Sequence, residues 1–297
     1  MVSPGILLVD KPAGLTSHDV VARTRRAFGT RKVGHAGTLD PMATGLLVIG
    51  IEGATRLLTY IVGADKTYEA TIRLGQTTGT DDADGEIVSM AAPDAWDAVT
   101  DDAITAGITT LTGEISQVPS AVSAIKVDGR RAYDRVRAGE DVVLAARDVV
   151  VSRFDVVARR QGEGTLDLDV VVDCSSGTYI RALARDLGSA LGVGGHLTAL
   201  RRTRVGPFDV ADAVALDDLA DARTLTPAQA AARILPPLPV SAEEARDLRH
   251  GKRLGDQAFR LEGTLAAAID PDGALVGIVE RRGTDLKSAM NMPEAAR

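Results

Sequence analysis

Two stretches of the chain alternate between apolar and polar residues with a period of two. Between Lys66 and Leu74 every second residue is apolar, and residues 166–172 repeat this pattern. The period is typical of a strand with one buried and one open face. Two continuous apolar runs, Ile6–Val9 and Leu46–Ile51, predict further strands that are buried more completely.

Helices are predicted where a capping residue begins a run with helical spacing. Thr16 or Ser17 is expected to begin a helix that continues to about Phe28 and ends at Gly29. Two more helices are expected over residues 55–62 and 178–191, and a strand over residues 197–205. Strands and helices therefore mix without a regular βαβ repeat, which favours an α+β fold over a doubly wound parallel sheet.

The end of the chain is predicted to form a separate small unit. The Pro236-Pro237-Leu238-Pro239 segment indicates a linker. A helix is expected near residues 242–250, and a hairpin around residues 270–273. A chain of 297 residues is long enough for one large domain with such an appendage.

The charge of the chain is unevenly distributed. A net charge of −7 argues weakly against a nucleic-acid partner. The basic residues, however, gather in three patches, at residues 23–32, 126–137 and 201–204, and such patches can bind a polyanion. The single cysteine, Cys174, excludes an intrachain disulfide and suits a reducing compartment. No apolar run has the length of a signal peptide or a membrane span, so a cytoplasmic protein without membrane contact is expected.

The segment from Gly34 to Gly45 places one carboxylate, Asp40, among small residues and directly before Pro41. The proline disfavours helical geometry at Asp40, and the glycines of the segment allow a ligand to approach the backbone closely. An acid on such a loop, next to a buried strand, has the placement of a functional group. The alternative is a turn aspartate that caps its own backbone, and spacing alone does not separate the two.

Several other functional motifs are incomplete or absent in this chain. The acidic loop at residues 75–86 lacks the twelfth-position acid of a calcium-binding loop, so no metal is expected. No phosphate-binding or dinucleotide-binding glycine motif occurs. Ser123-Ala124-Ile125-Lys126 matches the nucleophile motif of penicillin-type acyl enzymes, but its companion motifs are absent.

Six sequence blocks follow one another in a distinctive order along the chain. They are Val9-Asp10-Lys11-Pro12 with Gly14-Thr16-Ser17, the Gly34–Gly45 loop, Lys66 with Tyr68, Gly177-Thr178-Tyr179-Ile180-Arg181 with Leu183, Asp186-Leu187-Gly188, and His196-Leu197 with Leu200-Arg201-Arg202. In this order the blocks resemble the bacterial tRNA pseudouridine-55 synthases of the TruB type. The likeness is continuous over about residues 5–205.

This resemblance implies an α+β fold with a mixed, mainly antiparallel sheet. Residues 1–235 would form the catalytic domain, with a basic RNA-binding excursion at about 114–140. Residues 236–297 would form a small, β-rich RNA-binding domain of the PUA type. The implied activity is the isomerisation of uridine 55 in the T-loop of tRNA to pseudouridine, after the base is flipped out. A monomer that uses neither a cofactor nor a metal is expected.

The resemblance also assigns roles to individual residues. Asp40 matches the nucleophile, Tyr68 the tyrosine that stacks on the base and transfers a proton, and Arg181 the arginine paired with the aspartate. Such an arginine would keep the carboxylate ionised in a desolvated site. Attack at C6 of the base and attack at C1′ of the sugar both remain open. The positions expected to contact or support the substrate are His35, Tyr179, Leu200, Asp82 and Lys11.

A non-catalytic RNA chaperone is the main alternative. Such a protein would need the basic patches and the fold. It would not need Asp40, Tyr68 and Arg181 together, and the presence of all three favours the enzyme.

Overall fold

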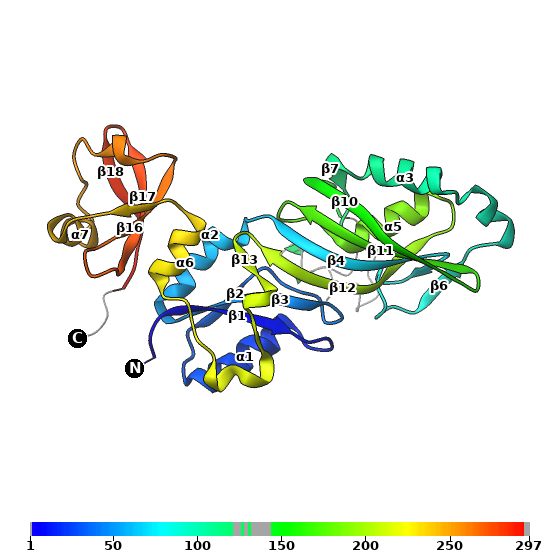
Figure 1. Cartoon of the computed structure of the whole chain (residues 1–297), viewed down its shortest axis with the longest axis horizontal. Coiled ribbons are helices and arrows are strands. Elements are labelled where there is room, and N and C mark those ends of the chain that lie inside the picture. The colour runs from blue at the N-terminus through cyan, green and yellow to red at the C-terminus, as the bar shows by residue number, and fades with distance from the viewer. Residues whose placement is uncertain (1, 121–125, 128–129, 132–143, 294–297) are drawn as a thin grey trace. The chain divides into compact units, whose positions relative to one another are not determined.

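The computed structural model describes residues 2–120, 126–127, 130–131 and 144–293. The chain divides into two compact units, which are described separately. The first consists of residues 1–41, 45–63 and 205–297, and the second of residues 42–44 and 64–204. Figure 1 shows the strands and helices of both.

The first unit contains a sheet built on the two apolar runs of the sequence. Strand β1 (Gly5–Lys11) pairs antiparallel with β3 (Thr44–Ile51), with Leu7 opposite Ile49. Strand β2 (Val33–Ala36) pairs with the other edge of β3, and β14 (Val214–Ala215) lies parallel to β1. Both faces of β1 and β3 are buried, which confirms the expectation from their continuous apolar sequence.

Helix α1 (Ser17–Phe28) covers one face of this sheet and begins and ends as predicted. Thr16 and Asp19 form a reciprocal capping box at its start, and Gly29 adopts a left-handed conformation (φ 65°) at its end. Val20 and Val21 of α1 join the apolar core formed by residues of β1, β2, β3 and the 3-10 segment η4 (Leu216–Asp221). The helix predicted at 55–62 consists of a 3-10 segment, η1 (Glu52–Leu57), followed by α2 (Leu58–Val62).

The C-terminal part of the first unit has its own sheet and its own core. Four strands follow one another in the order β15, β16, β17 and β18, and α7 packs with them. The helix and the hairpin predicted here are confirmed. The elements after η4 are α6 (Pro227–Ile234), β15 (Pro237–Pro239), α7 (Ala242–Arg249), η5 (Ala258–Arg260), β16 (Leu265–Ile269), β17 (Leu275–Arg282) and β18 (Asp285–Asn291).

The prediction of a linker at Pro236–Pro239 is wrong, because β15 pairs parallel with β16. Leu238 is buried in the core of this sheet, and the Ala267 N–H donates to the Pro236 carbonyl (2.9 Å). Proline lacks an N–H and is tolerated at the edge of a sheet. The segment therefore looks like a linker in sequence although it is an edge strand.

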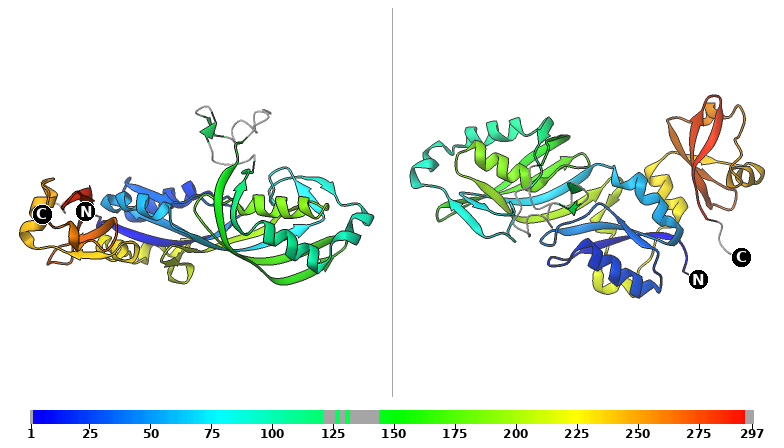
Figure 2. Two further views of the ribbon diagram at one scale, coloured as in Figure 1. Left: turned by 90° about the horizontal axis from the view of Figure 1, so that it is seen from above. Right: turned by 180° about the vertical axis from the view of Figure 1, so that it is seen from behind.

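The second unit is a sheet with the strand order β12, β4, β11, β10 and β7. Strand β4 has the predicted bounds, and its residues Tyr68, Ala70, Ile72 and Leu74 are buried. Helix α5 packs on one face of the sheet, with α3 beside it (Figure 2). The main elements are β4 (Lys66–Leu74), α3 (Asp101–Thr110), β7 (Gly113–Gln117), β10 (Arg147–Gly162), β11 (Thr165–Cys174), α5 (Ile180–Ala190) and β12 (Gly195–Val205).

On the other face of this sheet, polar side chains of β4 pair with those of β11 across the two strands. Arg73 lies opposite Asp167 and binds it with two hydrogen bonds of 2.7 Å, and Thr71 donates to Asp169 (2.7 Å). The antiparallel pairings β4–β11, β11–β10 and β10–β7 confirm the α+β class with a mainly antiparallel sheet.

The acidic loop at residues 75–86 includes β5 (Gln76–Thr78) and leads into β6 (Ile87–Met90), with which β5 pairs antiparallel. In the described part of the chain, no group of three or more potential metal ligands is found, and no helix is long and apolar enough to cross a membrane. The basic excursion predicted at about 114–140 lies largely outside the described residues. The exceptions are the end of β7, residues 118–120, β8 (Lys126–Val127) and β9 (Arg130–Arg131).

Candidate active site

The Asp40 loop is held in place by the backbone on both sides of the aspartate. Ser17 at the start of α1 accepts a hydrogen bond from the Leu39 N–H (2.9 Å) and donates one to the Leu39 carbonyl (3.2 Å). On the other side, the Gly14 N–H donates to the Pro41 carbonyl (2.8 Å). Asp40 itself is half-buried. The loop can turn sharply because Gly37 and Gly45 have φ values of 83° and 100°, which favour glycine.

Lys11 is fully buried and binds three backbone carbonyls. Its ammonium group donates to Leu15 (2.7 Å), Pro12 (2.9 Å) and Pro41 (3.3 Å). A buried ammonium group needs such acceptors, because burial without them is costly. These contacts give Lys11 a role in fixing the Asp40 loop, whereas its predicted contribution to substrate binding stays a prediction.

His35 lies on β2, five residues before Asp40, and its backbone pairs with Ile49 of β3. Its ring meets the ring of His18 edge-on, with 5.6 Å between centroids and 81° between the planes. His18 is exposed on α1. In the first unit, Lys11, His35 and Asp40 therefore belong to one loop and the strands beside it.

In the second unit, Tyr68 lies on the covered face of β4, opposite Val172 of β11, and is 8% exposed. Two positions before it, Lys66 is buried as well, and its ammonium group donates to the Ala64 carbonyl. Burial and the charge of Arg202 lower the pKa of Lys66 to about 8. Leu200 on β12 is buried and lines a cavity of about 570 Å³ together with Met42, Thr44 and other residues of this unit.

Arg181, in the first turn of α5, forms a buried ion pair with Asp82. The distance from Nη1 to Oδ2 is 3.3 Å, and both side chains are at least 95% buried. The same guanidinium group donates to the Thr80 carbonyl (2.9 Å). Asp82 also forms a β-bridge with Leu197 of β12. The structure thus brings two predicted site residues together, while the expected pairing of Arg181 with Asp40 stays a prediction.

Tyr179 is the residue that precedes α5 and has an extended backbone. The helix predicted over residues 178–191 would place Tyr179 in its first turn, but the helix begins one residue after it. The Gln117 side chain binds both the N–H and the carbonyl of Tyr179. Sequence analysis did not select Gln117, because a single glutamine in a short strand carries no pattern that distinguishes it from a surface residue.

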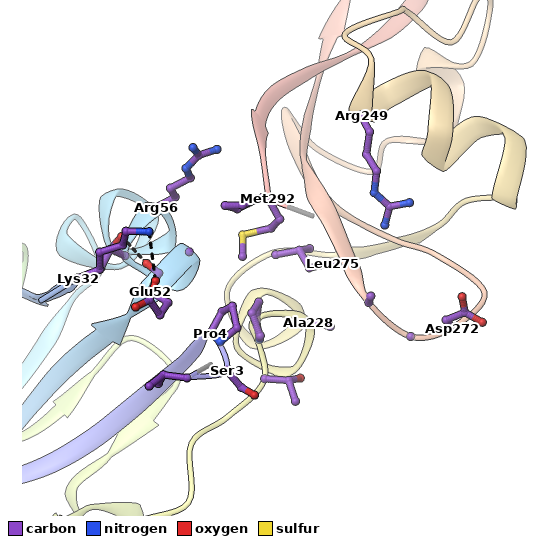
Figure 3. A pocket seen from close by; sticks show the side chains of 18 residues that line it. Ser3, Pro4, Lys32, Glu52, Arg56, Ala228, Arg249, Asp272, Leu275 and Met292 are labelled. Carbon is purple, nitrogen blue, oxygen red and sulfur yellow. Dashed lines mark hydrogen bonds and ion pairs between the residues drawn. The ribbon is translucent and has the colours of Figure 1, made fainter. Parts of the chain in front are cut away.

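A second cavity, of about 830 Å³, lies in the first unit (Figure 3). Its cationic side chains already have partners. Lys32 pairs with Glu52 (3.4 Å), Arg249 pairs with Asp270 (2.7 Å), and Arg56 donates to the Asn291 carbonyl (2.5 Å). Because these cationic side chains are already paired, the cavity is not included in the candidate site.

Comparison with solved structures identifies the fold. The chain is similar to one in a crystal structure of a Cbf5-Nop10-Gar1 complex, with a TM-score of 0.70 and 26% identity, over 98% of this chain and 84% of the other. It is also similar to a chain of an H/ACA RNP bound to a substrate RNA containing 2'-deoxyuridine, with a TM-score of 0.68 and 26% identity, over 98% of this chain and 84% of that one.

The family comparison defines the class of protein. Residues 25–180 match the N-terminal domain of the TruB family pseudouridylate synthases. Residues 181–240 match the C-terminal domain of tRNA pseudouridylate synthase B, and residues 235–293 match the C-terminal region of tRNA pseudouridine synthase II. Fold and matches together define a pseudouridylate synthase, an isomerase.

The chain belongs to the TruB family, which confirms the resemblance found in the sequence. It is 59% identical over 295 residues to the tRNA pseudouridine synthase B of Leifsonia xyli subsp. xyli, which covers 99% of this chain and 98% of that protein. It is 54% identical to the tRNA pseudouridine synthase B of Mycobacterium ulcerans, over 97% of this chain and 94% of that protein.

Proposed function

We propose that this enzyme converts uridine 55 in the T-loop of tRNA to pseudouridine, with Asp40 as the nucleophile. The observation that carries the proposal is the Asp40 loop. Its backbone is fixed on both sides of one half-buried carboxylate, by Ser17 and by Gly14. The names of the relatives, tRNA pseudouridine synthase B, support tRNA as the substrate.

The reaction breaks the N1–C1′ bond of the uridine and forms a C5–C1′ bond. A proton leaves C5 and a proton is gained at N1, so the conversion is an isomerisation without net oxidation or reduction. A carboxylate can trap one fragment covalently while the base turns, by attack at C6 or at C1′. Tyr68 would stack on the base and move a proton, and Arg181 would support the charge of Asp40.

The target base must leave the stack of the T-loop, which costs a few kcal/mol. Contacts of the basic patches with phosphates would offset this cost without reading sequence. His35, Tyr179 and Leu200 are proposed to contact the flipped nucleotide, while Asp82 supports it through Arg181. We assign catalysis to residues 1–235 and additional RNA binding to a PUA-like domain, residues 236–297, in a monomeric cytoplasmic enzyme.

The test is to map pseudouridine along an unmodified tRNA transcript after incubation with the protein. We expect conversion at position 55 and nowhere else. The Asp40→Asn variant keeps the shape of the side chain and removes its charge, so it should lose at least about 99% of the activity while tRNA binding changes little. Conversion at another position, or an active Asp40→Asn variant, would refute the corresponding part of the proposal.

A further inference from the structure

Gln117, the last residue of β7, is 2% exposed and makes two hydrogen bonds to one backbone unit. Its Oε1 accepts from the Tyr179 N–H (2.8 Å), and its Nε2 donates to the Tyr179 carbonyl (3.0 Å). A buried carboxamide is costly unless both of its ends are bonded. The pair of bonds therefore fixes the position of Tyr179 relative to β7.

Tyr179 is the point at which α5 begins, and its own side chain makes no capping hydrogen bond. The first N–H groups of a helix lack partners within the helix, so the direction of its first turn depends on contacts from outside. Arg181 follows two residues later and holds Asp82. Gln117 thus anchors the start of the turn that carries Arg181.

Arg185, one turn further along α5, contacts the neighbours of Gln117 and of Asp82. Its Nη2 donates to the carbonyl of Val118 (2.7 Å), the residue after Gln117. Its Nη1 lies 3.4 Å from Oδ2 of Asp81, the residue before Asp82. Asp81 has a φ of 59°, a backbone conformation that needs support from its surroundings. Two successive turns of α5 are therefore tied to residues 117–118 and to residues 80–82.

We infer that Gln117 is a positioning residue for the isomerisation. It acts through Tyr179 and Arg181, and Arg185 reinforces the same arrangement. This inference rests on the proposed function of Tyr179 and Arg181. It assigns a role in the reaction to a residue that touches neither the base nor Asp40 in the proposed mechanism.

The Gln117→Glu substitution tests this role, because its effect depends on pH. A protonated carboxyl group can accept from the Tyr179 N–H and donate to the Tyr179 carbonyl, as the amide does. A carboxylate cannot donate. Burial raises the pKa of a carboxyl group placed there. At saturating tRNA, the single-turnover rate of the variant divided by that of the wild type should therefore fall with rising pH, by up to about tenfold per pH unit.

Two further variants complete the experiment. Gln117→Leu should slow the reaction at least about tenfold at every pH, with the KM for tRNA nearly unchanged, because it misplaces reacting groups. Gln161→Glu is the matched control. The Gln161 amide also donates to a backbone carbonyl, that of Thr165 (3.2 Å), but in the β10–β11 hairpin. Its rate ratio should be independent of pH.

Near-ultraviolet circular dichroism at each pH gives the folded fraction. The inference is overturned if the rate ratio of Gln117→Glu does not change with pH, or if Gln117→Leu keeps the wild-type rate per folded molecule. Gln117 would then be a purely structural residue. A wild-type protein that modifies no uridine of the transcript would refute the proposed function instead, so the two failures are distinguishable.

Discussion

At the scale of single residues, the second unit contains a buried ion pair beside pairs that water reaches. Arg181 and Asp82 are both at least 95% buried, whereas the Arg73–Asp167 pair on the open face of the sheet is 35% and 17% exposed. Loss of one partner from a buried pair leaves the other charge without compensation. Exposed pairs contribute little, because water screens them.

Arg181→Met should therefore lower the free energy of unfolding by about 3–5 kcal/mol. Arg73→Met, the same change at the partly exposed pair, should lower it by less, because water can reach Asp167 and compensate its charge. Urea unfolding measures both. Adding Asp82→Asn to Arg181→Met should restore part of the loss, since residue 82 then no longer carries a buried charge. Equal losses for the two arginine variants would contradict the importance of burial.

The lowered pKa of Lys66 predicts that the free energy of unfolding depends on pH. The unfolded chain keeps this ammonium group charged up to its ordinary pKa of 10.5, but in the fold its pKa is about 8. The unfolded state binds more protons in that window, so the free energy of unfolding should rise between about pH 8 and 10.5, by about 3 kcal/mol in total.

Cys174 opposes this trend. Burial raises the pKa of its thiol from 9.0 to about 11, so its contribution to stability is lost between about pH 9 and 11. The measurement is therefore made in Cys174→Ala, with and without Lys66→Met. The increase should be present in the first and absent in the second. Parallel pH curves for the two proteins would show that Lys66 is not the group responsible.

At the scale of elements, the sequence predicted best those strands and helices whose two faces differ in polarity. Strand β4 alternates cleanly and has the predicted bounds, and α1 has unambiguous caps. Strand β10 was missed because register shifts after Val151 and Val156 break its alternation. Helix α3 was missed because only Ile104 and Gly107 are buried, too few residues to form an apolar stripe.

The candidate site, like the strands and helices, was predictable only where the local sequence has a distinctive pattern. Asp40 stands out because glycines and a proline surround it. The burial of Asp82 beside Arg181 and the bonds from Ser17 to Leu39 depend on which elements meet in space. No local pattern around residues 17 or 82 encodes those partners.

Ser17 links helix α1 to the Asp40 loop and allows a test at this scale. Ser17→Ala leaves the buried N–H and carbonyl of Leu39 without their hydroxyl partner, which should cost about 1–3 kcal/mol of stability. It should also slow the reaction at saturating tRNA, because the nucleophile is less well positioned.

Thr24→Ala is the control, because it removes a buried hydroxyl that binds the Val20 carbonyl within α1. It should leave the rate unchanged, because the bond that it removes lies within α1. Both variants are compared by urea unfolding and single-turnover rates. Equal rates for Ser17→Ala and Thr24→Ala would separate Ser17 from the positioning of Asp40.

At the scale of the whole molecule, the negative net charge hides a strong segregation of charge. Between Arg73 and Lys126 the sequence contains nine acidic residues and no lysine or arginine. Directly after this stretch, β8 and β9 pair Lys126 with Arg131. An acidic protein can therefore bind RNA, provided that the phosphates meet the basic patches and avoid the acidic stretch.

This segregation predicts a steep salt dependence of tRNA binding although the net charge is −7. Arg202 of the third patch is buried and cannot contact a phosphate. If the other residues of the three basic patches together contact about 4–6 phosphates, log affinity should fall with log salt with a slope of about −3 to −5. Arg130→Gln with Arg131→Gln should flatten the slope by up to about 1.4–1.8, because each lost contact removes about 0.7–0.9. The rate at saturating tRNA should hardly change, since phosphate contacts position the RNA and do not touch the reacting base.

Arg159→Gln with Arg160→Gln is the matched control. It removes the same charge, but these guanidinium groups are paired with Asp101 and Asp169. Its slope should remain that of the wild type, because an arginine already held by a carboxylate releases no counterion from RNA. An affinity independent of salt would show that stacking and shape dominate binding. Equal flattening by both double variants would show that only the overall charge of the protein matters, and that residues 130–131 are not a place where phosphates bind.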